Sequence, residues 1–82
     1  MRVPNFIFYP NPVETTLYIA QATSEKVTLD LFDIYGNLYI SRILDGTRNS
    51  THSVDVSGLP GGIYFARITS KGEINVYSIL KE

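Results

Sequence analysis

The chain contains no cysteine and no tryptophan. Without cysteine it cannot form a disulfide framework or a zinc site built on thiolates. Its seven basic and eight acidic residues nearly cancel, and they are scattered, so the basic stripe that nucleic-acid binding requires is missing. Its apolar runs are far shorter than the roughly 20 residues that span a membrane as a helix. The composition therefore predicts no nucleic-acid partner and no membrane insertion.

The sequence also lacks the apolar stretch of a secretory signal peptide in its first residues, Met1–Asn5. If the protein is exported, we expect its first export signal to lie in a longer parent protein. The 82 residues have the length of one domain, and a chain this short buries only about 60% of its unfolded surface, so its core is expected to be thin. A hydrophobic content of 44% is nevertheless ample for a folded domain.

Apolar and polar residues alternate along most of the chain, which is the pattern of half-buried β-strands rather than of helices. Between residues 26 and 34, for example, Val27, Leu29 and Leu31 share one face. The pattern predicts seven strands bounded by turn signals, at 5–9, 14–21, 26–34, 38–44, 51–56, 62–69 and 73–80. Such short strands predict an all-β protein, an antiparallel β-sandwich. We expect its core to include Leu29, Leu31, Tyr64, Ala66 and Ile68.

Two details of the third and fourth strands lead to local predictions. Phe32 and Ile34 fall on the face opposite Leu31, so either both faces are covered there or a β-bulge shifts the register. Gly36 and Asn37 both tolerate positive φ angles, and we expect them to form a tight hairpin turn between these strands.

The stretch Val54–Tyr64 is a strand end, a corner rich in glycine and proline, and a strand start. Gly58, Gly61 and Gly62 can adopt backbone conformations closed to other residues, and Pro60 presets its own φ angle. The stretch contains no residue pattern typical of catalysis. We therefore interpret it as a corner that turns the sheet.

Residue types that carry chemistry are few, and each has a structural explanation. His52 is the only histidine, and without a cysteine or a serine in a nucleophile-elbow phrase it is interpreted as a strand residue. Asp30 and Asp33 fall on opposite strand faces, so they cannot act as an acid–base pair without a β-bulge between them. Asp45 and Asp55 are interpreted as turn residues, since a calcium loop at Asp45 would need several oxygen ligands at fixed spacing. The sequence predicts no catalytic, cofactor-binding or metal site.

The tyrosines offer an alternative function. If several of them were exposed together, they would form a platform for stacking on a sugar. The structural interpretation is that they lie in the core or half-buried on the sheets, where aromatic residues fit well. The six tyrosines are Tyr9, Tyr18, Tyr35, Tyr39, Tyr64 and Tyr77.

Three phrases and the chain end resemble one known kind of domain. The phrases are Tyr9–Pro12, the Asp-Ile-Tyr-Gly run Asp33–Gly36, and Asp55–Tyr64; the chain closes on Ile79–Glu82. Their order and spacing are similar to those of the C-terminal sorting domain of the type IX (Por) secretion system of Bacteroidetes, type A. The resemblance extends from Tyr9 to Glu82.

The resemblance implies an immunoglobulin-like β-sandwich of about seven strands that is a secretion signal and not an enzyme. It implies that the domain, 1–82, is covalently part of a larger cargo protein. The cargo passes through the periplasm, the domain docks on the outer-membrane translocon, and a surface sortase cuts upstream of it. The cargo then reaches the cell surface or the medium, and no cofactor takes part. The candidate sorting-motif residues are Tyr9, Pro10, Asn11, Pro12, Asp33, Gly36, Asp55, Ser57, Gly58, Leu59, Gly62, Tyr64 and Lys81.

Two positions depart from the pattern that the resemblance implies. Ser78 stands where a lysine is usual, and Gly61 stands where serine is common. Neither departure disturbs the alternation of the strands. Two other functions stay open at this point: a carbohydrate-binding accessory module that uses the tyrosines, and a passive spacer domain of a secreted enzyme.

Overall fold

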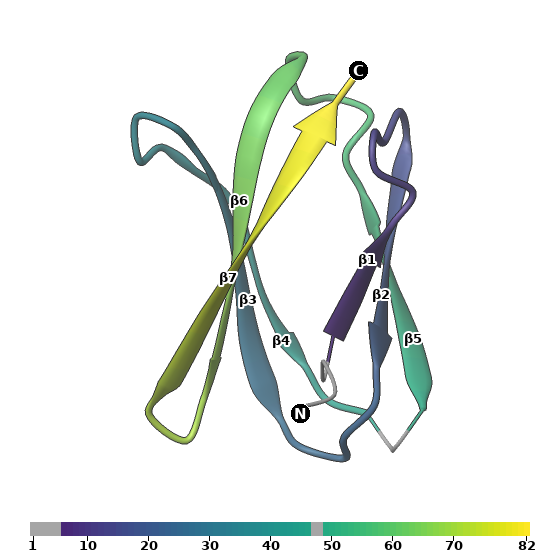
Figure 1. The fold of residues 1–82 in the computed structure, drawn as a ribbon, viewed down its shortest axis with the longest axis vertical. Coiled ribbons are helices and arrows are strands. Elements are labelled where there is room, and N and C mark those ends of the chain that lie inside the picture. Colours follow the sequence, from purple (N-terminus) through teal and green to yellow (C-terminus); the bar gives the residue numbers. More distant parts are fainter. Residues whose placement is uncertain (1–5, 47–48) are drawn as a thin grey trace.

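The computed structural model describes residues 6–46 and 49–82, which form seven β-strands and no helix (Figure 1). The strands are β1 (Phe6–Tyr9), β2 (Thr16–Gln21), β3 (Val27–Asp33), β4 (Leu38–Leu44), β5 (Ser50–Asp55), β6 (Gly62–Ser70) and β7 (Glu73–Lys81). All seven predicted strands are confirmed, with ends that differ by at most two residues. The predicted first residue of the first strand, Asn5, lies outside the described residues.

The strands form two sheets that face each other as a sandwich (Figure 1). One sheet has the order β1-β2-β5 and the other β4-β3-β6-β7, and every pair of neighbouring strands is antiparallel. The predicted fold class, an immunoglobulin-like antiparallel β-sandwich, is therefore confirmed. In constant-type immunoglobulin domains the fourth strand joins the sheet of the first two, whereas here β4 pairs with β3.

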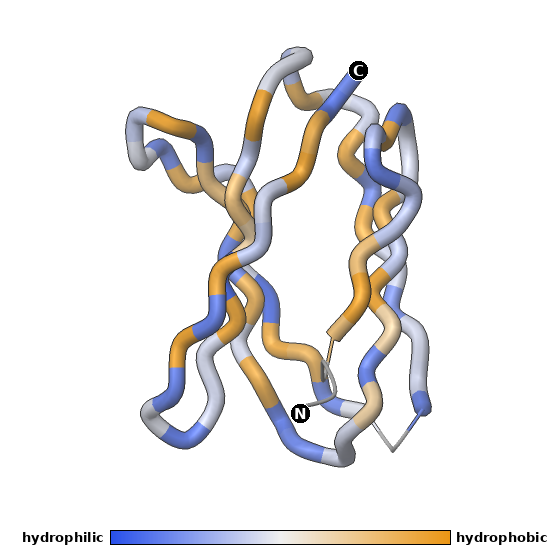
Figure 2. The backbone as a smooth tube through the Cα atoms, viewed as in Figure 1, coloured by the Kyte–Doolittle hydropathy of each residue, from blue (hydrophilic) through white to orange (hydrophobic). Residues whose placement is uncertain are grey.

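The core lies between the two sheets and is made by the inward-facing residues, which alternate with outward-facing residues along the strands. Figure 2 shows hydrophobic stretches along the strands of both sheets and hydrophilic residues in the turn that joins β6 to β7. Each large aliphatic side chain that is removed from water contributes about 1.5–3 kcal/mol to folding. The predicted core residues Leu29, Leu31, Tyr64, Ala66 and Ile68 are all buried, which confirms that prediction. They pack with Phe6, Val13, Leu17, Ile19, Val27, Leu44, Val54, Val56 and Ile79.

The predicted register change in the third strand is present. The β3–β4 ladder shifts between Leu31, which pairs with Ile40, and Phe32, which pairs with Leu38, so Tyr39 is the extra residue of a β-bulge. Phe32 is half-buried on the outer face of its sheet, where its ring lies 5.9 Å from that of Phe65. Both alternatives raised from the sequence, a β-bulge and partial burial of the outer face, are therefore present.

The β3–β4 turn differs from the prediction. Gly36 has a φ of 85°, but Asn37 has no positive φ, so the expected two-residue turn on Gly36-Asn37 is wrong. The turn instead begins at Asp33, whose carbonyl accepts the Gly36 N–H at 3.1 Å, and Ile34 and Tyr35 are its central residues. The physical reason is the Asp33 carboxylate, which accepts the backbone N–H of Tyr35 and so fixes the turn before Gly36.

The glycine corner between β5 and β6 also differs in part from the prediction. Of its three glycines only Gly62 has a positive φ, of 147°, which L-residues with a side chain adopt at a cost. Gly58 and Gly61 have no such φ angle. A Cβ at Gly61 would meet the Lys81 carbonyl oxygen at an ordinary 3.5 Å, and one at Gly58 would meet nothing within 4 Å. The expectation of a special backbone conformation thus holds for Gly62 alone.

Candidate functional site

The phrases that carry the resemblance lie at one end of the sandwich, beside the C-terminal end of β7 (Figure 1). The antiparallel order causes this, because the β1–β2, β3–β4 and β5–β6 connections must all fall at the end where β7 finishes. We call this region the motif end, and it comprises residues 9–13, 33–39, 56–64 and 78–82. Residues that are far apart in the sequence are therefore neighbours there.

The first phrase adds to the outer edge of β7. The Asn11 side chain donates from Nδ2 to the Ser78 carbonyl at 3.2 Å and accepts the Leu80 N–H at Oδ1 at 2.9 Å. Two residues on, the Val13 N–H donates to the Leu80 carbonyl at 2.8 Å, and the Val13 carbonyl accepts the Glu82 N–H at 2.9 Å. Both proline peptide bonds of the phrase, at Pro10 and Pro12, are cis. The phrase thus covers the edge of the last strand from residue 78 onward.

The second phrase is organised by the Asp33 carboxylate. It accepts the backbone N–H groups of Tyr35 at 2.9 Å and Asn37 at 3.0 Å, the Asn37 side-chain amide at 3.0 Å, and the Tyr39 hydroxyl at 3.1 Å. Partial burial raises the pKa of Asp33, but the hydrogen bonds from Asn37, Tyr35 and Tyr39 outweigh it, so the pKa lies below its usual value. The bond to Asp33 in turn raises the pKa of Tyr39. The carboxylate therefore stays charged and fixes the hairpin.

The third phrase is held by hydrogen bonds of the same kind. Asp55 accepts the Ser57 N–H at 2.9 Å, and hydrogen bonds from Ser57 hold the pKa of Asp55 below its usual value. The buried Tyr64 donates its hydroxyl to the Pro60 carbonyl at 2.6 Å, and Leu59 packs against the core. These contacts fix the backbone of the corner between β5 and β6, after which β6 begins its pairing with β7 at Gly62.

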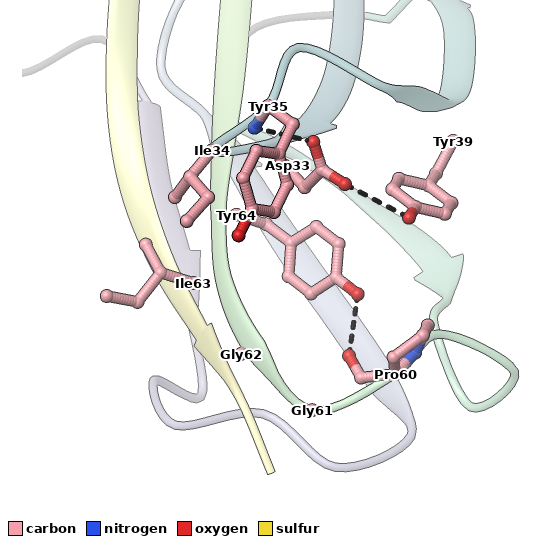
Figure 3. Close-up of a pocket in the computed structure, with 9 residues that line it drawn as sticks. All are labelled: Asp33, Ile34, Tyr35, Tyr39, Pro60, Gly61, Gly62, Ile63 and Tyr64. Atoms are coloured by element: carbon pink, nitrogen blue, oxygen red, sulfur yellow. Dashed lines mark hydrogen bonds between the residues drawn. The ribbon is translucent and has the colours of Figure 1, made fainter.

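The second and third phrases meet at an open pocket of about 390 Å³ (Figure 3). Figure 3 shows the hydrogen bonds of Asp33 and Tyr64, which fix side chains that line the pocket. The rings of Tyr39 and Tyr64 pack edge to face, with their centroids 5.6 Å apart. The pocket is lined by Asp33, Ile34, Tyr35, Tyr39, Pro60, Gly61, Gly62, Ile63 and Tyr64.

A second pocket, of about 220 Å³, adjoins the first because Ile63 lines both. It lies between the first phrase and β7, and its other lining residues are Asn11, Ser78, Ile79 and Leu80. Four large apolar side chains around the two pockets are exposed: Ile34 by 61%, Tyr35 by 83%, Ile63 by 53% and Leu80 by 45%. The second and third phrases and the last strand therefore supply exposed apolar side chains around two adjoining pockets, and the first phrase contributes Asn11 to the smaller one.

Lys81, a candidate motif residue, is not presented to solvent. It is 8% exposed, and its Nζ donates to the backbone carbonyl of Glu82 at 2.6 Å. Neighbouring residues of a strand face opposite sides, so burial of Lys81 goes with exposure of Leu80. The side chain that the last strand offers a partner at the motif end is therefore Leu80 and not the lysine.

The other residues singled out in the sequence lie away from the motif end. His52 is half-buried, with its Nε2 2.8 Å from Oε1 of the buried Gln21. Asp30 accepts the Ser41 hydroxyl at 2.6 Å and an Arg67 N–H at 3.1 Å; the hydrogen bond from Ser41, followed by that from Arg67, holds its pKa below the usual value. Asp30 and Asp33 have separate partners, as their opposite strand faces predict. Residues 6–46 and 49–82 contain no cluster of three or more metal-ligating side chains.

The tyrosines do not form one platform. Tyr9 and Tyr18 stack on each other at 5.5 Å, and Tyr77 packs against Phe8 at 4.9 Å. The other three, Tyr35, Tyr39 and Tyr64, line the larger pocket, where Tyr64 is buried. The exposed tyrosines thus form two separate pairs, Tyr9 with Tyr18 and Tyr35 with Tyr39, and not one platform of all six; the carbohydrate-binding alternative stays a prediction. In the part of the chain that is described, no helix has the length and apolar character needed to cross a membrane.

Three residues of the motif end were not among the candidate motif residues: Val13, Ile63 and Leu80. Val13 pairs with Lys81 in a parallel bridge between residues 68 positions apart, for which local patterns give no signal. Ile63 and Leu80 are cross-strand partners in the β6–β7 ladder. Each of them precedes a residue that was singled out, Tyr64 and Lys81, and therefore faces the opposite side of the sheet. This alternation was the sequence signal that Ile63 and Leu80 would be exposed together.

The fold and the motif end define an immunoglobulin-like β-sandwich module with a surface assembled from its turns and its last strand. The chain matches the profile of the secretion system C-terminal sorting domain over residues 7–82, and it belongs to this family. Its domain is thus a C-terminal sorting signal of type IX secretion, which directs export to the cell surface or beyond. A search of curated proteins found no match. The type A form and a Bacteroidetes source stay predictions.

Proposed function

We propose that residues 1–82 act as one non-catalytic export domain whose motif end docks on the outer-membrane translocon of the type IX system. The cargo protein upstream of the domain crosses the periplasm, and a surface sortase cuts it before the domain. One observation supports this proposal above the others: the three phrases and the last strand converge on two adjoining pockets that share Ile63 and are ringed by exposed apolar side chains.

The surface suits recognition by shape rather than by charge. Burying exposed apolar area contributes about 25 cal/mol per Å², and Ile34, Tyr35, Ile63 and Leu80 supply such area together. The carboxylate of Asp33 is already saturated with hydrogen bonds from its own hairpin. Since the backbone around the pockets is fixed in advance, little ordering entropy is lost when a partner binds.

The candidate motif residues divide into two kinds in this proposal. Most of them shape the surface: Asn11 bonds to the edge of β7, Asp33 and Gly36 make the hairpin, and the run from Asp55 to Gly62 makes the corner. The direct contacts with the translocon come from their neighbours, Tyr35, Ile63 and Leu80. The family phrases are thus required because they present these apolar side chains.

The test uses residues 1–82 fused behind a signal peptide and a reporter in a type IX-competent host. Ile63→Glu places a charge between the two pockets, and we expect the reporter to stay in the periplasm. The matched control is Ile43→Glu, because Ile43 is equally apolar, is 66% exposed and lies on the same outer sheet face, away from the motif end. Its reporter should be exported normally.

Folding has to be separated from recognition in this test. Both isolated variants should show the circular dichroism spectrum and cooperative thermal unfolding of the unsubstituted domain, since both positions are exposed. Export of a folded Ile63→Glu fusion at the level of the Ile43→Glu fusion would contradict docking through the motif end.

A further inference from the structure

The outer edge of β7 is covered along only part of its length. β7 is the end strand of the four-stranded sheet, and Asn11 and Val13 bond to its backbone from Ser78 to Glu82. The Val13 segment runs parallel to the strand. This edge therefore already accepts an extended segment of polypeptide in the half nearer the C-terminus.

The other half of the edge is open. Successive residues of a strand direct their backbone groups to opposite edges, and the outward groups of β7 are those of Ser78, Leu80 and Glu82. The N–H and C=O groups of Ile74 and Val76 point to the same edge by this alternation. Within the described residues no strand pairs with them there, because β7 has β6 as its one neighbour.

The segment Ile74–Ser78 lacks the features that protect the other sheet edges. β4 carries the bulge at Tyr39 and the charged Arg42, which is paired with a buried leucine across the ladder. β1 has four residues and is followed by Pro10, and β5 is polar and ends at Asp55. Charges, prolines and bulges are the usual means of preventing edge pairing. In Ile74–Ser78 there is no charge and no proline, and the ladder with β6 is continuous.

The side chains beside this open edge are apolar. Ile74 is 61% and Val76 is 53% exposed, and both lie on the outer face of the sheet. The run Ile74–Leu80 is rich in β-branched and aromatic residues and carries no charge, as in segments that pair readily with a further strand. An added strand with apolar residues at alternate positions would place them against Ile74 and Val76.

We propose that the open edge of β7 at Ile74–Ser78 binds an extended strand of a partner polypeptide by β-augmentation. The partner's backbone pairs with Ile74, Val76 and the Ser78 N–H, and its alternate β-branched side chains cover Ile74 and Val76. The segment that carries Asn11 and Val13 already pairs with the same edge of β7. A partner strand would extend this pairing toward the β6–β7 turn, and this continuity supports an extended polypeptide as the ligand. Apart from Ser78, which also belongs to the motif end, this surface lies toward the β6–β7 turn, and the inference does not rest on the proposed function (Figure 1).

The experiment titrates the isolated domain with the peptide acetyl-Lys-Thr-Val-Thr-Ile-Thr-Val-Lys-amide and follows backbone amide exchange by NMR. We expect saturable protection of the Ile74, Val76 and Ser78 amide protons. Val76→Pro removes one outward N–H while leaving the β6–β7 bonds intact, so it should abolish the protection. Val76→Thr keeps the N–H and the β-branched shape, and should retain it.

Two further results decide the proposal. If Val76→Pro does not fold, Ile74→Lys, at an exposed position, provides the second test and should also abolish protection. The proposal is overturned if millimolar peptide protects none of the three amides, or if protection is the same in the blocked variants. It is also overturned if sedimentation shows that two copies of the domain pair through this edge without peptide.

Discussion

Removing the Asn11 side chain tests how firmly the first phrase is attached to the last strand. Asn11→Ala deletes the donor to the Ser78 carbonyl and the acceptor of the Leu80 N–H. Both bonds lie at the surface, so water replaces the lost partners and the cost per bond falls in the lower half of the usual range of about 0.5–1.5 kcal/mol. We expect a loss of about 1–2 kcal/mol in the free energy of unfolding.

That loss is large enough to measure in a domain of this size. For 60–100 residues, 1 kcal/mol lowers Tm by about 4–8 °C. The local effect is more specific: the Leu80 amide proton, which donates to Asn11, should exchange faster with solvent. Asn11→Asp keeps an acceptor for Leu80 but turns a carboxylate toward the Ser78 carbonyl, and should also be destabilised.

The matched control is Asn75→Ala, because Asn75 is an exposed asparagine of β7 itself. We expect it to change stability by less than about 0.5 kcal/mol. Thermal unfolding followed by circular dichroism gives the global value, and NMR hydrogen exchange gives the local one. If Asn11→Ala matched Asn75→Ala in Tm and left Leu80 exchange unchanged, the attachment of the phrase to β7 would be refuted.

The glycine corner, the hairpin carboxylate and the buried tyrosine give three further predictions. Gly62→Ala should lower the free energy of unfolding by about 1–3 kcal/mol because of its φ of 147°, whereas Gly61→Ala should have little effect; equal losses in denaturant unfolding would contradict this. The folded pKa of Asp33 is lowered, so its stabilisation is present above the unfolded pKa of about 3.9 and is lost as pH falls through the folded pKa. Urea unfolding between pH 5 and the acid limit should therefore show a smaller loss for Asp33→Asn than for the unsubstituted chain, and parallel pH curves would count against it. Tyr64→Phe removes the bond to the Pro60 carbonyl and should cost about 0.5–1.5 kcal/mol by thermal unfolding, while an unchanged Tm would show that the bond does not close the corner.

Strands such as β2, β3 and β6 were predictable because each of them buries one face, and burial of one face imposes a period of two on the sequence. In β3, Val27, Leu29 and Leu31 face the core and the residues between them do not, as the alternation indicated. The β3–β4 turn was not placed correctly, because glycine and asparagine indicate that a turn occurs but not where it begins. A carboxylate hydrogen bond from Asp33 decided its position.

The candidate site was predictable in its parts but not in its assembly. The phrases at Asn11, Asp33 and Gly62 were recognised, yet nothing in the local sequence shows that Asn11 bonds to a strand that lies 69 residues further on. Contacts of this range depend on how the two sheets pack, which periodicity does not specify. Burial of Lys81 was not predicted for the same reason, since its neighbour across the strand edge is Val13, 68 residues earlier in the chain.

The central claim is that this domain carries a type IX sorting signal, and transplantation tests it most directly. Residues 1–82 are fused behind a signal peptide and a reporter in a type IX-competent host of the same genus, and the reporter at the surface and in the medium is compared with a fusion that lacks the domain. We predict that the fusion with the domain reaches the surface or the medium. Retention of both reporters in the periplasm to the same extent would contradict the claim.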